Sequence, residues 1–166
     1  MILALDISTV QTGYCVGAVN KKPRWGVFRP QGALSRTERI AFMAASVAQL
    51  VKSLHVRQVV AEQLSVTSYK RADGTKGGAN FKSAEALAEC RGVIKHELRR
   101  FLLPMTDVNL QSARSKLGIR ERMGIEKGGV KKADVIQWLR NNGVPVDNGD
   151  EADAIVVWMA VSLGKV

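Results

Sequence analysis

The stretch Ile2-Leu3-Ala4-Leu5-Asp6-Ile7 holds one carboxylate inside a run of apolar side chains. An apolar run of this kind predicts a buried central β-strand, which we place over residues 2–8. A charge buried in such a strand is costly unless it is paired or binds a metal ion. Asp6 is therefore the first candidate for a functional residue, and its strand is the first element of the predicted fold.

Three further acidic residues have settings that suit metal binding. Glu62 closes a second apolar run, and Asp150 and Asp153 are three residues apart at the start of a helical pattern, so they share one helix face. Carboxylates that are brought together repel each other, which raises the pKa of some of them. Two Mg²⁺ ions carry about the charge that neutralises four carboxylates, and hard oxygen ligands suit Mg²⁺. We therefore expect two Mg²⁺ ions per site, with Mn²⁺ as a substitute.

The rest of the chain is strongly basic. Its 166 residues include 25 Lys and Arg against 15 Asp and Glu, which gives a net charge of +10. Such a balance favours a polyanionic partner over a merely basic soluble protein. Carboxylates for metal, together with cations for phosphate, indicate nucleic-acid cleavage.

The sequence carries no sign of a membrane or secreted protein. It has no signal segment and no stretch of about 18 apolar residues. Cys15 and Cys90 have neither zinc-site nor CxxC spacing, so we expect reduced core thiols. We expect a soluble, cytoplasmic protein.

The hydrophobic patterns predict an α/β protein of one domain over residues 1–166. A capping box at Ser35 and Glu38 marks the start of the first helix. The predicted strands are 2–8, 14–19, 25–28, 57–62 and 105–109, and the predicted helices are 35–54, 83–100, 131–141 and 150–163. This order predicts a five-stranded mixed sheet flanked by helices. Asp6 would lie mid-strand and Glu62 at a neighbouring strand end, and the last helix would bring Asp150 and Asp153 across.

Two stretches have compositions of their own. Residues 65–82 combine glycines, basic residues and aromatics, which indicates a contact loop. Residues 111–132 are basic and broken by glycines, and as a cluster they favour phosphate contact. Gly92, inside the predicted helix 83–100, would be explained by a close helix crossing.

Motifs over nearly the whole chain share one resemblance. They are the Asp6 strand with Thr12-Gly13 after it, Val59-Val60-Ala61-Glu62-Gln63, Ala88-Glu89-Cys90-Arg91-Gly92, Lys116, and Asp150-Glu151-Ala152-Asp153-Ala154-Ile155. Together they resemble the RuvC family of Holliday-junction resolvases, within the ribonuclease H-like superfamily. The last motif is the most specific of them, and none would be enough alone.

The resemblance implies roles for individual residues. Asp6, Glu62, Asp150 and Asp153 would bind the metals, and Lys116 falls where the family has a phosphate-directed lysine. A second family lysine corresponds to Lys127, Lys131 or Lys132, and an aromatic that stacks at the junction centre corresponds to Tyr69 or Phe81. The predicted DNA contacts are Tyr69, Lys70, Arg71, Lys76, Phe81, Arg114, Lys116, Lys127, Lys131 and Lys132.

The resemblance also implies a homodimer. A four-way junction offers two symmetry-related strands, so a two-fold dimer would place two sites correctly. Helix 83–100, where Gly92 would allow close approach, is the candidate interface.

Two departures from the family pattern stand out. Ile7-Ser8 follows the first aspartate, where the family commonly has Pro-Gly, and the loop after Glu62 is longer. The longer loop is consistent with a phage or mobile-element branch, and it leaves cleavage sequence preference and strict junction selectivity open.

The leading hypothesis is a Mg²⁺-dependent endodeoxyribonuclease that resolves Holliday junctions or other branched DNA by paired nicking. In two-metal hydrolysis a water is activated at one ion and the leaving oxygen is stabilised at the other, so no protein nucleophile is needed. Asp6 would bridge both ions, and Lys116 would neutralise charge on the phosphate. The alternatives are another ribonuclease H-like nuclease, acting on hybrids or flaps, and a catalytically inactive junction-binding protein.

Overall fold

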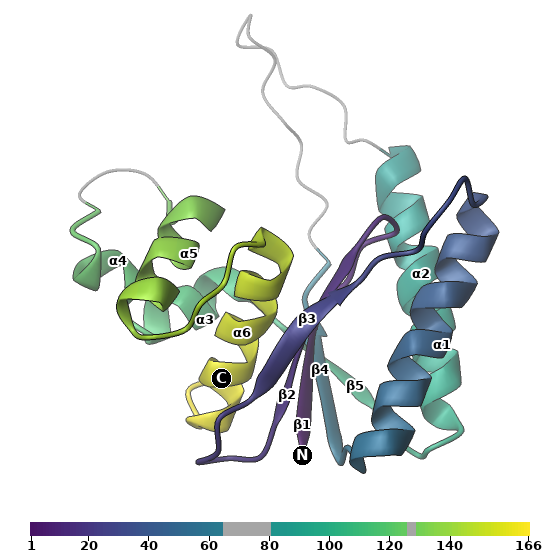
Figure 1. Ribbon diagram of the computed structural model, residues 1–166, viewed down its shortest axis with the longest axis horizontal. Coiled ribbons are helices and arrows are strands. Elements are labelled where there is room, and N and C mark those ends of the chain that lie inside the picture. Colours follow the sequence, from purple (N-terminus) through teal and green to yellow (C-terminus); the bar gives the residue numbers. More distant parts are fainter. Residues whose placement is uncertain (65–80, 126–128) are drawn as a thin grey trace, which may run out of the picture.

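A mixed β-sheet separates two groups of helices (Figure 1). The computed structural model describes residues 1–64, 81–125 and 129–166. Its strands are β1 (Ile2–Asp6), β2 (Thr12–Gly17), β3 (Arg24–Phe28), β4 (Gln58–Glu62) and β5 (Met105–Val108). They form a five-stranded sheet in the order β3-β2-β1-β4-β5, in which β1 is antiparallel to β2 and parallel to β4. The predicted fold class is confirmed.

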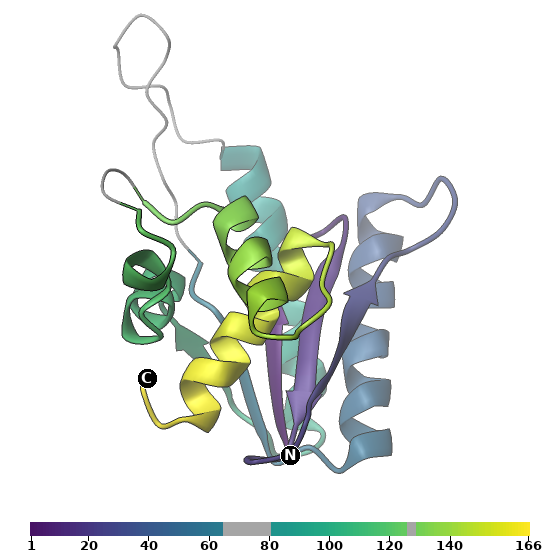
Figure 2. The same cartoon turned by 60° about the vertical axis from the view of Figure 1, so that its left-hand side comes forward.

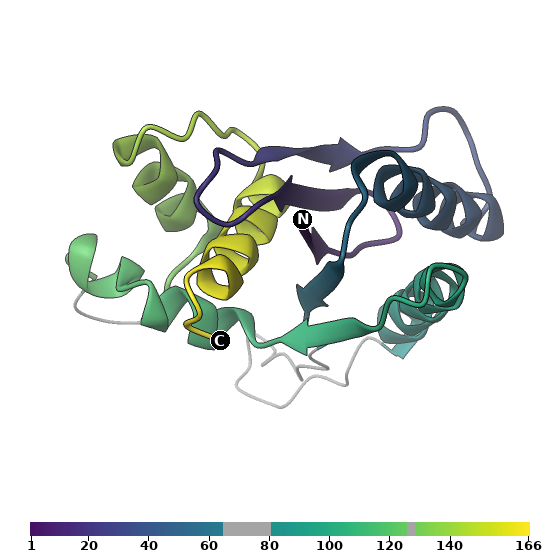
Figure 3. The same cartoon turned by 90° about the horizontal axis from the view of Figure 1, so that it is seen from below.

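One helical layer covers each face of the sheet. The helices are α1 (Arg36–Leu54), α2 (Phe81–Arg99), α3 (Leu110–Lys116), α4 (Ile119–Arg122), α5 (Lys132–Asn141) and α6 (Gly149–Ser162). Seen from below, α1 and α2 pair on one side of the sheet, and α6 lies with α3, α4 and α5 on the other (Figure 3). The predicted capping box of α1 is present, with Ser35 accepting from the Glu38 amide and Glu38 accepting from the Ser35 amide.

Helices α3 and α4 correct the prediction for residues 111–132. The glycines there suggested an irregular stretch, but Gly118 has a φ of 67° and serves as the link between two short helices. Leu110, Ala113 and Ile119 are buried in the core beneath α6. Apolar packing therefore makes this basic segment part of the fold.

Residues of β1 alternate between the two faces of the sheet. Ile2 and Ala4 belong to the core that contains α6, whereas Leu3 and Leu5 belong to the core that contains α1 and α2. Side chains two apart on a strand point to the same face, so Asp6 follows Ala4 toward α6. Asp6 is the last residue of β1 rather than a mid-strand residue as predicted, because the ladder with β2 ends at this position.

Gly13 allows α6 to lie close against the sheet. Helix α6 packs on β1 and β2 (Figure 2). A Cβ atom at Gly13 would overlap the backbone carbonyl of Asp150. Only a residue without a side chain fits there.

Gly92 was predicted to mark a close helix crossing, and within this chain that prediction is wrong. A Cβ atom at this position of α2 would have no described heavy atom within 4 Å, because the position is exposed. Its place in the candidate dimer interface stays a prediction.

Two predictions from composition can also be compared with the structure. Cys15 and Cys90 are buried free thiols, as expected. Among the described residues, the helices are too short or too polar to cross a membrane.

The two glycines give a matched pair of variants. We expect Gly13→Ala to destabilise the protein by about 3 kcal/mol, because the added methyl group meets backbone that cannot move aside. Gly92→Ala should be neutral, or stabilise by up to about 1 kcal/mol, because alanine favours the helix and has open space. Urea unfolding of both variants measures the difference, and equal effects would contradict the close approach of α6.

Candidate metal centre

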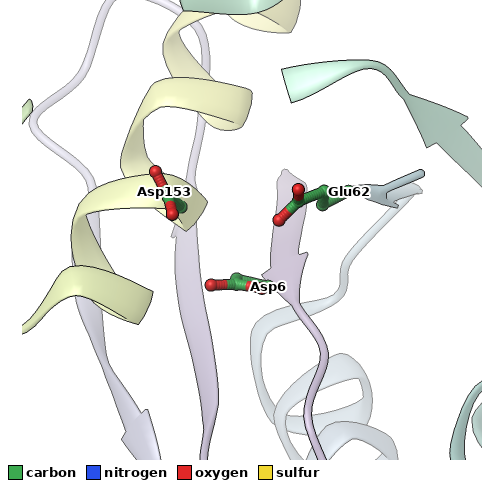
Figure 4. Close-up of side chains that lie close together, drawn as sticks. All are labelled: Asp6, Glu62 and Asp153. Atoms are coloured by element: carbon green, nitrogen blue, oxygen red, sulfur yellow. The ribbon is translucent and has the colours of Figure 1, made fainter. Parts of the chain in front are cut away.

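Three carboxylates from distant parts of the chain meet at one end of the sheet. Asp6 ends β1, Glu62 ends β4, and Asp153 lies in the second turn of α6. One oxygen from each lies within 4.8 Å of the others, so the group could hold a metal ion. Figure 4 shows the three side chains pointing into the same space.

The sheet itself aligns Asp6 and Glu62. Leu5 pairs with Ala61 in the parallel ladder of β1 and β4, so the next residues, Asp6 and Glu62, lie side by side at the strand ends. Glu62 follows Val60 onto the face that α6 covers, just as Asp6 follows Ala4. Strand pairing and side-chain alternation are enough to bring both carboxylates to α6.

Asp153 is fully buried and is held by Arg114. The Arg114 guanidinium donates to Oδ1 of Asp153 at 2.5 Å and to the carbonyl of Val130 at 2.7 Å. Oδ2 of Asp153 accepts no hydrogen bond from the described residues. Lys132 Nζ lies 3.3 Å from that oxygen but outside hydrogen-bonding geometry. Three carboxylates with so few donors between them offer oxygen ligands from three directions, so the cluster could hold a divalent metal ion.

The position of Arg114 corrects its predicted role. We expected Arg114 on the DNA-contacting surface, but its side chain is only 6% exposed. The guanidinium pairs with Asp153 inside the protein and is not part of the exposed surface.

Asp150 lies beside the three-carboxylate group rather than in it. Its Oδ1 accepts from Lys132 Nζ at 2.7 Å and its Oδ2 accepts from Gln11 Nε2 at 3.0 Å. Arg29 donates to the other end of the Gln11 amide. The N-cap of α6 is Asn148, whose side chain accepts from the amide of Asp150. Asp150 is therefore free of a capping role.

Among the described lysines, Lys132 reaches the carboxylates. Its Nζ lies 3.3 Å from Oδ2 of Asp6, in addition to its contacts with Asp150 and Asp153. Of the three lysines the resemblance left open, Lys127 lies outside the described residues and Lys131 is exposed. Lys116 is exposed in the last turn of α3, and no contact within the described ranges joins its side chain to the carboxylates.

Most residues of the predicted contact loop cannot be placed. Tyr69, Lys70, Arg71 and Lys76 lie outside the described residues. Phe81 is the first residue of α2, and its side chain is not described. The predicted stacking role of Tyr69 or Phe81 stays a prediction.

Two residues near the site had no role in the sequence prediction. Gln11 was missed because a glutamine in a loop carries no signal of its partners. Arg91 appeared only within a motif, yet it is buried, donates to the carbonyl of Glu62 at 2.6 Å and pairs with Asp107. With Asp6 and Glu62 it lines a pocket of about 110 Å³. Arg91 therefore holds the end of β4 in place.

Burial and crowding shift the titration of the cluster. Burial raises the pKa of Asp6 to about 7; Lys132 opposes the shift, and the charges of Glu62, Asp153 and Asp150 add to it. The pKa of Glu62 is raised by burial and by Asp153. Burial alone would lower the pKa of Lys132, but the Asp150 hydrogen bond and the nearby aspartates outweigh it and raise that pKa. The cluster is therefore short of positive charge, which further favours a metal ion.

Comparisons with known proteins bear on the fold. No protein-family model matches the chain, and no curated protein matches it in sequence. Among solved structures, Thermus thermophilus RuvC matches with a TM-score of 0.67 at 16% identity, covering 99% of this chain and 96% of that one. RuvC of T. thermophilus in complex with a Holliday junction substrate matches with a TM-score of 0.67 at 14% identity and the same coverage.

A second resolvase has the same architecture. The yeast mitochondrial Holliday junction resolvase Ydc2 matches with a TM-score of 0.58 at 13% identity, covering 98% of this chain and 78% of that one. The chain therefore has the ribonuclease H-like fold of RuvC and Ydc2, as the sequence motifs predicted.

The raised pKa of Asp6 predicts a pH-dependent stability. Between the ordinary value of 3.8 and about 7, folded Asp6 holds a proton that the unfolded chain releases. In a chelator, this contribution to the free energy of unfolding should be present near pH 4 and lost as the pH rises through 7. Asp6→Asn cannot titrate, so the wild type should lose stability relative to this variant over that window. Urea unfolding at several pH values measures the difference in the free energy of unfolding between the wild type and Asp6→Asn, and Asp147→Asn is the control at an exposed position. A difference that stays constant with pH would contradict the raised pKa of Asp6.

Proposed function

We propose that this protein is a metal-dependent DNA endonuclease that cleaves four-way junctions or other branched DNA by paired nicking. The observation that carries the proposal is the meeting of Asp6, Glu62 and Asp153 around a buried oxygen that lacks a donor. A RuvC structure with the same fold was solved in complex with a Holliday junction substrate. The fold alone would not specify an activity, so the proposal depends on the site.

The three carboxylates would hold the catalytic metal. A divalent ion bound there would supply an activated water and stabilise the leaving oxygen of the phosphodiester. Asp6 and Glu62 are fixed by the sheet, and Asp153 is fixed by Arg114, so the ligands are preorganised. Asp150 shares the Lys132 ammonium group with Asp6 and Asp153, so it would serve a second ion once Lys132 releases it.

Basic residues near the site would bind the phosphate backbone. Lys132 is at the carboxylates, and Lys131 and Lys116 are exposed. The net charge of +10 supports a polyanionic substrate. Paired nicking would need two sites, so we propose a two-fold homodimer, with the exposed Gly92 face of α2 as its candidate interface.

Cleavage of a synthetic four-way junction tests the proposal. In Mg²⁺, Asp6→Asn should lower the cleavage rate by more than about 100-fold, because a metal ligand is lost. Junction binding should persist or tighten, because one negative charge near the DNA is removed. Asp147→Asn makes the same chemical change at an exposed site paired with Arg140 and should cleave like the wild type. Equal loss of binding and cleavage in Asp6→Asn would indicate misfolding instead.

The choice of substrate separates the alternatives. The wild type should cut the junction in preference to plain duplex and to an RNA–DNA hybrid. Cleavage of the hybrid alone would overturn the resolvase proposal in favour of another ribonuclease H-like nuclease. Binding without cleavage in both Mg²⁺ and Mn²⁺ would identify an inactive junction-binding protein.

Binding should depend steeply on salt. Each phosphate neutralised by a lysine or arginine releases counterions, and the slope of log Kobs against log salt changes by about 0.9 per contact. We therefore expect junction affinity to fall at least about tenfold between 50 and 200 mM salt. Fluorescence anisotropy with a labelled junction measures it, and a flat response would contradict a basic DNA-binding surface.

A further inference from the structure

Lys132 has the surroundings of a bound cation. Its ammonium group lies 2.7 Å from Oδ1 of Asp150, 3.3 Å from Oδ2 of Asp6 and 3.3 Å from Oδ2 of Asp153. Three carboxylates around one positive centre form the arrangement that a divalent ion takes up in a protein. The same three residues could supply a second metal position, because each has an oxygen within 3.3 Å of this one positive centre, whereas Glu62 has no ion pair with Lys132 among the described residues.

The partners of Asp150 divide the cluster into two parts. Lys132 and Gln11 engage one oxygen of Asp150 each, and the Lys132 ammonium group occupies the space between Asp150 and the other aspartates. Among the described residues, Glu62 has no ion pair with Lys132, although it lies within 4.8 Å of Asp6 and Asp153. The cation position that includes Glu62 is therefore open to an ion, and the position at Asp150 is filled by the ammonium group.

The charge balance agrees with this division. Four carboxylates face two side-chain cations, Arg114 and Lys132, so two negative charges remain, which is the charge of one divalent ion. A second divalent ion would leave an excess of positive charge beside the Lys132 ammonium. Like charges this close repel strongly in a partly buried site.

Lys132 differs from Arg114 in its freedom to leave. The Arg114 side chain is 6% exposed, whereas the Lys132 side chain is 52% exposed at the start of α5. Its stem passes over Gly149, where an added Cβ would lie 2.8 Å from Cδ of the lysine. The ammonium group can therefore swing into solvent, or onto a phosphate, without unpacking the core.

We propose that the ammonium group of Lys132 occupies the second cation position of the site, so that the protein without DNA takes up one divalent ion, and the second ion enters when Lys132 leaves. The inference rests on the proposed metal site. A DNA phosphate offers Lys132 an alternative partner, so substrate binding would open the second position. Binding of DNA and of the second ion would then favour each other, as linkage requires.

The number of Mn²⁺ ions bound per chain tests this directly. Isothermal titration at pH 8.5, above the pKa of Asp6, keeps protons from competing. The wild type should bind one Mn²⁺ per chain, and Lys132→Met should bind two. The affinity of Lys132→Met for the second Mn²⁺ should be at least tenfold higher than any residual affinity of the wild type for a second ion. Lys132→Arg keeps the positive charge and should still bind one Mn²⁺ per chain. Lys52→Met removes a lysine charge from α1, away from the site, and should also stay at one.

A second variant covers the case in which Lys132→Met does not fold. Gly149→Ala keeps the charge but crowds the lysine stem, so it should displace the ammonium group and strengthen the second Mn²⁺ site. Circular dichroism identifies the folded variants.

The outcomes distinguish this inference from the proposed function. One Mn²⁺ in the wild type that Asp6→Asn abolishes, with the same single ion in Lys132→Met and Gly149→Ala, would overturn the role of Lys132 and leave the metal site intact. Two Mn²⁺ in the wild type would also overturn it. No Mn²⁺ bound by any variant would overturn both the inference and the proposed metal site.

Discussion

The repulsion among buried carboxylates is the constraint on which the rest of the site depends. Asp6 and Asp153 lie where water is largely excluded, and Glu62 is close to both. Their mutual repulsion must be balanced by cations, because an isolated buried charge would change its protonation or unfold its surroundings. Arg114 and Lys132 supply part of that balance from the chain itself. The remainder is a negative charge that a bound metal ion could balance.

The sheet holds these mutually repelling carboxylates in fixed positions. Parallel pairing of β1 and β4 brings two carboxylates to one edge, and side-chain alternation turns both toward α6. Gly13 then lets the start of α6 come near enough for Asp153 to join them. Burial of apolar side chains stabilises this close approach of α6, since all residues from Ala152 to Val157 are buried and all but Asp153 are apolar. Hydrophobic burial therefore offsets the electrostatic cost of the cluster.

Local patterns in the sequence were sufficient for the five strands, for four of the helices and for the three carboxylates that meet, but not for the short helices α3 and α4. The apolar runs ending in Asp6 and Glu62 identified neighbouring strands, and the predicted sheet was confirmed. The predictions that were wrong or missing concerned residues whose contacts lie in distant segments of the chain. Arg114 looked like a surface residue because its neighbours in sequence are basic, yet its partner is 39 residues away. Gln11 reaches Asp150 across 139 residues, which no periodicity can indicate. Gly92 looked like a packing residue, and its open surroundings follow only from the placement of α2.

Arg114 and Lys132 neutralise the carboxylates in different ways, and the difference follows from the chemistry of their side chains. A guanidinium group is planar and weakly hydrated, so it can stay buried while donating to both Asp153 and the carbonyl of Val130. An ammonium group on a flexible stem is strongly hydrated and returns to water at little cost. The permanent counter-charge of this site is accordingly the arginine, and the exchangeable one is the lysine. If their places were reversed, the deep carboxylate would lose its fixed orientation, and the exposed cation would be harder for an entering ion to displace.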